Sequence, residues 1–183
     1  MTEHRDRVAE LLADWRAQYP EALAPTSELA KRIIVLAADL DEASRRILPD
    51  FDLTVAEFQI LVALRRSPPP HRLKPNELSS SLLMSSGGTS NVTNELVGRR
   101  LVEREDDPDD RRSSWVRLTE EGARLAERAV RASTAAHSDV FAGAADEDVR
   151  VATDALRRLS AAVEAPRQPT PPPARATRPQ SVT

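Results

Sequence analysis

The sequence contains no cysteine, so it forms no disulfide and offers no thiolate to a metal ion or to a substrate. Its three histidines, at positions 4, 71 and 137, are scattered and lack the spacing of metal ligands. No apolar run approaches the roughly 20 residues that a helix needs to cross a bilayer, and residues 1–10 lack the apolar segment of a secretory signal. These absences predict a cytoplasmic protein with no metal, no cofactor and no membrane span.

The sequence also lacks a convincing catalytic constellation. Gly87 and Gly88 are not followed by the Lys and Ser/Thr of a phosphate-binding loop. Adjacent acids such as Asp106 and Asp107 lie in a loop, with no apolar enclosure that would shift their pKa values. We therefore expect that the protein is not an enzyme.

Net positive charge is absent as well, because the formal charge of the 183 residues is −3. The length suits one domain with a modest core. An acidic balance argues mildly against nucleic-acid binding, since isolated DNA-binding domains are usually basic. An acidic body can nevertheless carry a basic face, and its repulsion elsewhere lowers non-specific binding.

What the sequence does contain is centred on residues 85–118. Residues 86–99 predict a helix with Ser85 as N-cap and with Val92, Leu96 and Val97 on one apolar face. The other face is small and polar, and comprises Ser86, Gly87, Thr89, Ser90, Asn91, Thr93 and Asn94. Such a helix fits the major groove of B-DNA, where base edges present donors and acceptors. The alternative is an ordinary amphipathic helix with a solvated polar face.

A β-hairpin is predicted directly after this helix. Residues 101–104 and 115–118 alternate in polarity, and a turn-rich loop lies between them. Arg111 and Arg112 near the tip of the loop suit the negative potential of the minor groove. A solvated charged turn is the alternative. The helix and hairpin together have the outline of a winged helix.

These residues resemble the multiple-antibiotic-resistance regulator (MarR) family. The run Asp107-Pro108-Asp109-Asp110-Arg111-Arg112 carries the resemblance, with Val116-Arg117-Leu118-Thr119 and Gly122 after it. Upstream matches are Leu53-Thr54, Pro75-Asn76-Glu77-Leu78 and Ser90-Asn91, and the resemblance covers roughly residues 28–164. It implies a homodimeric, ligand-responsive transcriptional regulator, a repressor, that binds a palindromic operator in double-stranded DNA. The alternative function is a winged-helix protein-interaction module without specific DNA binding.

The fold is expected to be mainly α: a winged helix-turn-helix with a small β-hairpin wing and an all-helical dimerisation region. Further helices are predicted at 5–19, 27–48, 54–66, 75–83, 119–141 and 146–163, with a short strand around Arg72 and Leu73. Their predicted caps are Ser27, Thr54 in a capping box with Glu57, and Thr119, and the predicted buried residues include Phe58, Val62 and Leu83. We expect an extra N-terminal helix within 1–25, a dimerisation region at 26–50 and 119–165, and a DNA-binding lobe at 51–118. Proline, arginine and small polar residues dominate 166–183, which predicts a disordered tail.

The expected DNA contacts come from the recognition helix, residues 86–99, and from the wing, residues 105–114. They are Ser85, Ser86, Thr89, Ser90, Asn91, Asn94, Arg111 and Arg112. Asp107 or Asp110 is expected to support the wing by holding an arginine in place.

The extra N-terminal helix resembles the branch of the family with PecS-type and urate-responsive members, in which a tryptophan of this helix lies near the ligand pocket. The resemblance implies a small aromatic or anionic ligand. Its expected pocket residues are Trp15, Phe58, Gln59 and His71. Gln59 stands where urate-responsive members carry an acid, which argues against urate. Simple packing is the alternative role for all four.

Overall fold

The computed structural model describes residues 6–82, 85–108 and 114–164. The chain divides into two compact units, Met1–Ala142 and Gly143–Thr183. The helices of the first unit are α1 (Arg7–Gln18), α2 (Ser27–Ile47), α3 (Val55–Arg66), α4 (Pro75–Leu82), α5 (Ser86–Gly98) and α6 (Glu120–Val140). It also has two 3-10 helices, η1 (Pro20–Ala22) and η2 (Leu48–Phe51), and three strands, β1 (Arg72–Leu73), β2 (Val102–Asp106) and β3 (Ser114–Leu118). The second unit contains α7 (Asp146–Glu164).

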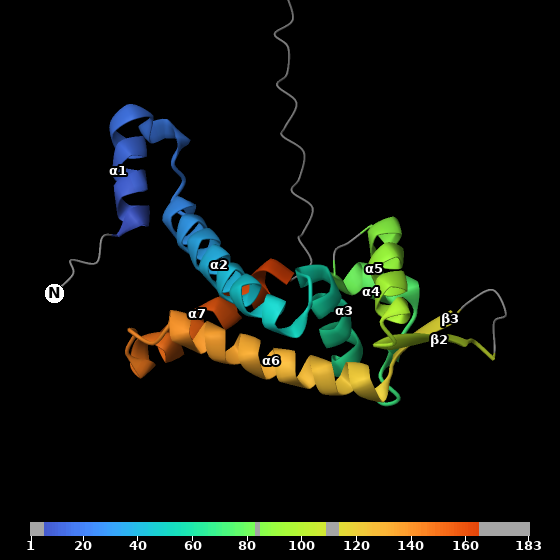
Figure 1. Ribbon diagram of the computed structural model, residues 1–183. Helices are drawn as coiled ribbons and strands as arrows, with labels where there is room; N and C mark the ends of the chain where they lie inside the picture. Colours follow the sequence, from blue (N-terminus) through green and yellow to red (C-terminus); the bar gives the residue numbers. More distant parts are fainter. Residues whose placement is uncertain (1–5, 83–84, 109–113, 165–183) are drawn as a thin grey trace, which may run out of the picture. The chain divides into compact units, whose positions relative to one another are not determined.

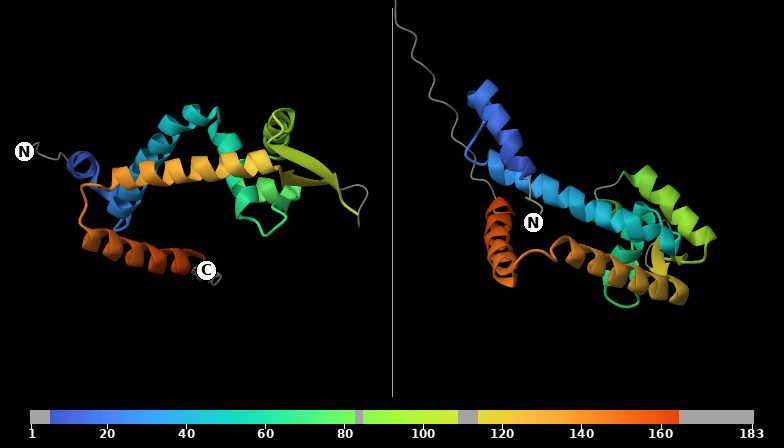
Figure 2. Two further views of the ribbon diagram at one scale, coloured as in Figure 1. Left: turned by 60° about the horizontal axis from the view of Figure 1, so that its bottom comes forward. Right: turned by 60° about the vertical axis from the view of Figure 1, so that its left-hand side comes forward.

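This architecture confirms the predicted mainly α winged helix-turn-helix. Helix α6 packs along α2 and α3, and the β2–β3 hairpin extends beyond the helices (Figures 1 and 2). The three strands form one antiparallel sheet in the order β1-β3-β2, so the predicted strand at Arg72 and Leu73 does pair with the hairpin. The hairpin strands run over 102–106 and 114–118, and are therefore longer than the sequence predicted.

The core of the first unit lies where α3, α4, α5, the sheet and α6 meet. Its fully buried side chains include Ile60, Leu61, Leu64, Leu78, Leu96, Val102, Val116, Ala126 and Ala129. They come from elements far apart in the sequence, and each element contributes its apolar face, as its periodicity predicted. Phe58 and Val62, also predicted as core residues, are half-buried.

Local capping fixes where several helices begin. Thr54 and Glu57 form the predicted capping box of α3, and Thr119 caps α6 by accepting the Gly122 N–H at 3.0 Å. The predicted cap at Ser27 is wrong. Ser27 is the first residue of α2, and its hydroxyl oxygen accepts the Ala24 N–H at 2.9 Å, which stabilises the preceding turn.

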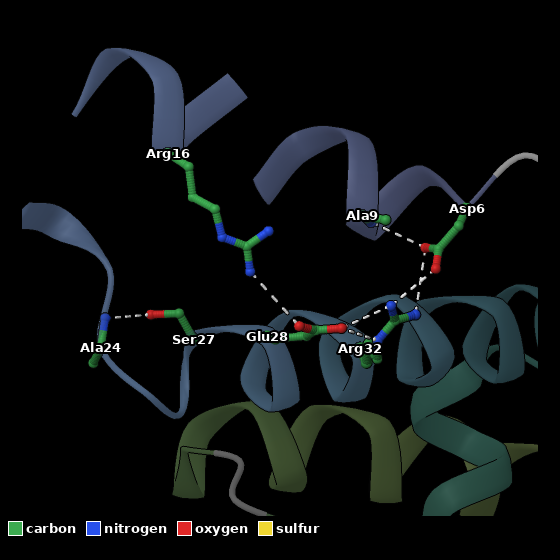
Figure 3. Close-up of polar contacts among 7 residues, drawn as sticks. All are labelled: Asp6, Ala9, Arg16, Ala24, Ser27, Glu28 and Arg32. Atoms are coloured by element: carbon green, nitrogen blue, oxygen red, sulfur yellow. Dashed lines mark hydrogen bonds and ion pairs between the residues drawn. The ribbon is translucent and has the colours of Figure 1, made fainter. Parts of the chain in front are cut away.

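The N-terminal helix α1 packs on α2 through Val8 and Leu12, both buried. Arg32 of α2 donates to Asp6 and to Glu28 at 2.9 Å each, and these polar contacts tie the start of α1 to α2 (Figure 3). The Arg32 hydrogen bond lowers the pKa of Asp6. Trp15, expected as a packing or pocket residue, has 45% of its surface exposed.

Apolar side chains also remain exposed on α2 and α7. Those of α2 are Leu29, Ile33, Ile34 and Leu36. Those of α7 are Val149, Val151, Leu156, Leu159 and Val163. Within α7, four of these five recur at spacings of three, four or seven residues and so form one stripe along the helix.

Gly122 marks the closest approach between α6 and the start of the hairpin. A Cβ atom built on Gly122 would lie 1.9 Å from the backbone oxygen of Leu101. Backbone cannot yield as a side-chain tip can, so α6 sits at this distance because residue 122 has no side chain.

We expect Gly122→Ala to lower the free energy of unfolding by about 2 kcal/mol or more, because the added methyl group overpacks the junction. Gly98→Ala is the matched control, since nothing lies within 4 Å of a Cβ at that helical position. It should raise stability by up to about 1 kcal/mol through helix propensity. Urea unfolding followed by circular dichroism measures both. Equal stability of the two variants would contradict the close-contact argument.

Candidate nucleic-acid interface

Helix α5 begins at Ser86, directly after its N-cap residue Ser85. Ser85 has extended backbone geometry, and its hydroxyl oxygen accepts the Gly88 N–H at 3.1 Å, as predicted for an N-cap. Its hydroxyl hydrogen can still donate to a phosphate oxygen. The helix N-terminus also offers backbone N–H groups to an anion.

The exposed face of α5 is formed by short polar side chains. Ser90, Asn91 and Asn94 are exposed, as expected of DNA-contacting residues. Glu95 is exposed beside them and was not singled out from the sequence. Because these groups are small, the helix axis can approach another surface closely.

The structure corrects the prediction that Thr89 contacts DNA. The sequence placed Thr89 and Thr93 on the polar face, but each retains only 2% of its exposed surface. Their hydroxyls donate within the helix to the carbonyl oxygens of Ser85 and Thr89, at 3.0 and 2.7 Å. With the hydroxyl bonded to its own helix, threonine fills a core position in line with Leu96. Thr89 is therefore not available for DNA contact.

The C-terminal end of α5 is held by Arg99. One guanidinium nitrogen lies 2.7 Å from Oε1 of Glu57, and another lies 3.1 Å from Oδ2 of Asp52. Glu57 uses its second oxygen to accept the backbone N–H and the hydroxyl of Thr54, at 2.8 Å each. A single buried carboxylate thus caps α3 and anchors the end of α5.

The pKa of Glu57 reflects this arrangement. Burial acts to raise the pKa, but the hydrogen bonds from Thr54 and Arg99 and the charge of Arg99 outweigh it, so the pKa of Glu57 is lowered. The carboxyl group is consequently ionised at neutral pH and remains paired.

The residues directly after α5 are held by Thr119, the N-cap residue of α6. Arg100 has a left-handed φ of 58°, and the Thr119 hydroxyl donates to its carbonyl oxygen at 2.8 Å. The Thr119 N–H donates to the Leu101 carbonyl oxygen at 3.2 Å. Helices α3 and α6 therefore both determine where α5 ends.

The base of the wing is built around Trp115. The Arg72 guanidinium and the Lys74 ammonium lie 4.6 and 4.9 Å from the centre of its ring. Lys74 Nζ lies 2.8 Å from Oδ2 of the buried Asp107, and Arg72 donates to Glu105 at 2.9 Å. Asp107 was expected to hold an arginine of the wing, but the cation it pairs with here is Lys74, which was not predicted from the sequence.

Several predicted contacts fall where the structure gives no description. Asp110, Arg111 and Arg112 lie outside the described residues, and so does Leu83 of the predicted buried set. The backbone of Ser86 is the first turn of α5, but nothing is described of its side chain.

Arg104 is a second residue of this surface that sequence reasoning missed. It is exposed on β2, and its guanidinium donates to Oδ1 of Asn94 at 2.9 Å. The alternation of the strand, with Val102 buried on the same face, could have indicated that Arg104 points toward α5.

The four predicted ligand-pocket residues do not line one pocket in the described chain. Trp15 borders a groove of about 310 Å³ between α1 and α2. Phe58 and Gln59 border a separate depression of about 270 Å³ between α3 and α4. His71 contacts neither, because its ring bonds the Ser67 carbonyl oxygen at 2.8 Å and Arg65 at 3.3 Å.

The search for other chemistry covers the described residues only. Within 6–82, 85–108 and 114–164, no group of three or more histidines and acids is placed to hold a metal ion. None of the helices in those ranges is long and apolar enough to span a bilayer.

Comparison with known proteins shows which family the chain resembles. Residues 51–113 match the model of the MarR family. The chain is 23% identical to the HTH-type transcriptional regulator PecS of Dickeya dadantii, over 77% of this chain and 85% of that protein. The relatives are named transcriptional regulators, in agreement with the prediction that the chain is not an enzyme.

Solved structures share the fold. AbsC, a MarR family transcriptional regulator from Streptomyces coelicolor, superposes with a TM-score of 0.64 at 25% identity, covering 77% of this chain and 96% of that one. A mutant MarR from E. coli complexed with operator DNA gives a TM-score of 0.62 at 23% identity, covering 79% and 96%.

The contact between Glu57 and Arg99 gives a pH-dependent prediction. Glu57→Gln should lower the free energy of unfolding at neutral pH by about 2 kcal/mol, because a buried charged acceptor is lost. A lowered folded-state pKa contributes stability above the unfolded-state pKa, and that stability is lost as pH falls through the folded-state pKa. The difference from wild type should therefore shrink below about pH 4.

The control for this prediction is Glu147→Gln, which removes an exposed carboxylate paired with Arg150 on α7. It should change stability by less than about 0.5 kcal/mol. Urea titrations at several pH values measure both variants. A Glu57→Gln difference that stays constant down to pH values well below the carboxyl range would contradict the ionised pair.

Proposed function

Because the chain belongs to the MarR family of winged helix-turn-helix transcriptional regulators, we propose that it is a homodimeric, ligand-responsive repressor of a palindromic operator. The observation that carries the proposal is the exposed face of α5, where Ser90, Asn91 and Asn94 stand on a helix fixed at both ends. The E. coli MarR mutant complexed with operator DNA has the same fold, which supports this use of the surface.

In the proposed complex, α5 lies in the major groove with these three side chains at base edges or phosphates. Ser85 and the first backbone N–H groups of α5 bind phosphate oxygens at the helix start. Arg111 and Arg112 enter the adjacent minor groove from the wing. A regulator of this kind acts where the DNA is, and we propose a cytoplasmic location on that ground.

Dimerisation would involve the region 26–50 and 119–165. The exposed apolar residues on α2, among them Ile33 and Leu36, are uncovered within the described part of the first unit, and the apolar stripe of α7 is uncovered within the described part of the second. A second copy would bury them at a two-fold interface, and contiguous apolar surface of this kind marks association sites. The same axis would place two α5 helices about one DNA turn apart.

Ligand response is proposed from the family and from two surface features. The groove beside Trp15 is lined by apolar side chains from α1 and α2, and Lys31 offers a positive charge at that site for an anionic ligand. The depression beside Phe58 and Gln59 lies against α4, the helix that precedes the recognition helix. A ligand at either place would release DNA by favouring a spacing of the two lobes that does not match the grooves. The similarity to PecS supports the branch with the extra N-terminal helix.

The wing prediction is tested with the full chain on the DNA that flanks its own gene, in a mobility-shift assay with unrelated competitor. We expect retention that resists the competitor and weakens steeply with salt, because several phosphates are contacted. Arg111→Ala combined with Arg112→Ala should weaken binding about tenfold or more and leave the dimer intact. Unchanged affinity would refute the wing assignment, and no binding at low salt would favour a protein-interaction module.

The dimer prediction concerns the apolar stripe of α7. Leu156→Lys combined with Leu159→Lys should convert a dimer to a monomer in sedimentation velocity and abolish operator retention, because charges would be buried at the interface. Ala161→Lys is the control, since Ala161 is exposed and lies on the opposite side of the helix from the stripe. A double variant that sediments as the wild type would exclude α7 from the interface.

A further inference from the structure

The recognition helix carries almost no charge of its own. Between Ser86 and Gly98 the only charged residue is Glu95, so positive potential at this surface must come from neighbouring elements. Most nearby cations are neutralised by carboxylates. Arg99 pairs with Glu57 and Asp52, and Lys74 pairs with Asp107.

The neighbouring strand cations follow the same pattern. Arg72 pairs with Glu105, and Arg117 pairs with Glu103 and Glu105. These pairs hold the sheet together, but they leave little net charge to attract DNA.

Arg104 differs from all of them. It is exposed on β2 beside α5, and its hydrogen-bond partner in the described part of the chain is the neutral amide of Asn94. Among the described residues, no carboxylate forms an ion pair with Arg104 and cancels its positive charge. Arg104 places a full charge next to the polar face of the recognition helix.

The contact also orients the amide of Asn94. A guanidinium group only donates hydrogen bonds, so its partner must be the oxygen Oδ1 and not the nitrogen Nδ2. The two N–H donors of Nδ2 then remain for an outside partner, since Asn94 is exposed. Arg104 thus decides which end of the amide is available.

This orientation has a consequence for base recognition. Asparagine reads adenine by donating to N7 while Oδ1 accepts from the N6 amino group. With Oδ1 engaged by Arg104, an adenine amino group would meet an occupied acceptor and a nearby cation. Guanine offers two acceptors, N7 and O6, along the same edge and suits donors from both residues.

We propose that Arg104 is a specificity-determining residue that sets the Asn94 amide to select guanine over adenine in each half-site. The proposal rests on the proposed operator binding and goes beyond it by assigning one base preference to one hydrogen bond. It concerns a residue outside the predicted recognition helix and the loop arginines.

The test is selection of bound sequences from a randomised DNA pool by the full chain, followed by affinity measurements on single-base variants of the enriched site. Asn94→Ala identifies the position that Asn94 reads, because base preference should be lost there. At that position the wild type should prefer guanine to adenine by about tenfold. Arg104→Met should reduce this ratio at least about fivefold and raise the relative affinity for adenine.

Arg128→Met is the matched control, since Arg128 is an exposed arginine on α6 and its loss changes the net charge equally. It should leave the base preference unchanged. If Arg104→Met weakens all sequences alike and keeps the guanine preference, or changes nothing, the specificity assignment is overturned. A wild-type chain that enriches no sequence would overturn operator binding itself, which is a distinguishable failure.

Discussion

The contact between Glu57 and Arg99 is the constraint on which the arrangement of the DNA-binding lobe depends. One carboxylate completes the N-cap of α3 and anchors the C-terminal end of α5, and the same arginine reaches Asp52 at the end of η2. A buried carboxylate without such partners would be costly, so each element needs the others to keep this charge satisfied. The recognition helix is therefore positioned by an electrostatic requirement of the core.

This junction also connects the lobe to the long helices. Residue Leu48 begins η2 directly after α2 ends, and Thr119 bonds the turn after α5 just before α6 begins. Because Gly122 lets α6 contact the Leu101 carbonyl group directly, α6 and the hairpin cannot move closer together. A change in the separation of α2 and α6 would therefore displace the end of α5. The proposed response to a ligand would require this kind of coupling.

Local features of the sequence predicted most of the fold. The capping box at Thr54, the N-caps at Ser85 and Thr119, and the helical periodicities depend on residues a few positions apart, and all of them are confirmed. Thr89 shows where such reasoning fails. A threonine whose hydroxyl bonds its own helix presents a methyl group to the core, and composition alone does not distinguish that from an exposed polar residue.

Contacts between residues that are far apart in the sequence could not be predicted from local sequence patterns. The pairs Lys74 with Asp107 and Asn94 with Arg104 join separate elements, and only the folded arrangement brings them together. Local reasoning also could not show which predicted pocket residues share a surface, because Trp15 and Phe58 border different depressions of the first unit.

The acidic net charge is compatible with DNA binding because most of the cationic side chains have a structural role. Most arginines near the interface neutralise carboxylates and so contribute to rigidity more than to attraction. Attraction then depends on a few residues whose charge is not cancelled within the described chain. Arg104 is one of them, and it lies beside Asn94, the residue that we propose reads a base. Because general electrostatic attraction is weak in such a protein, non-specific binding is suppressed and discrimination depends on the geometry of individual hydrogen bonds. An acidic body around a recognition helix that itself carries no cation is thus suited to selectivity more than to overall affinity.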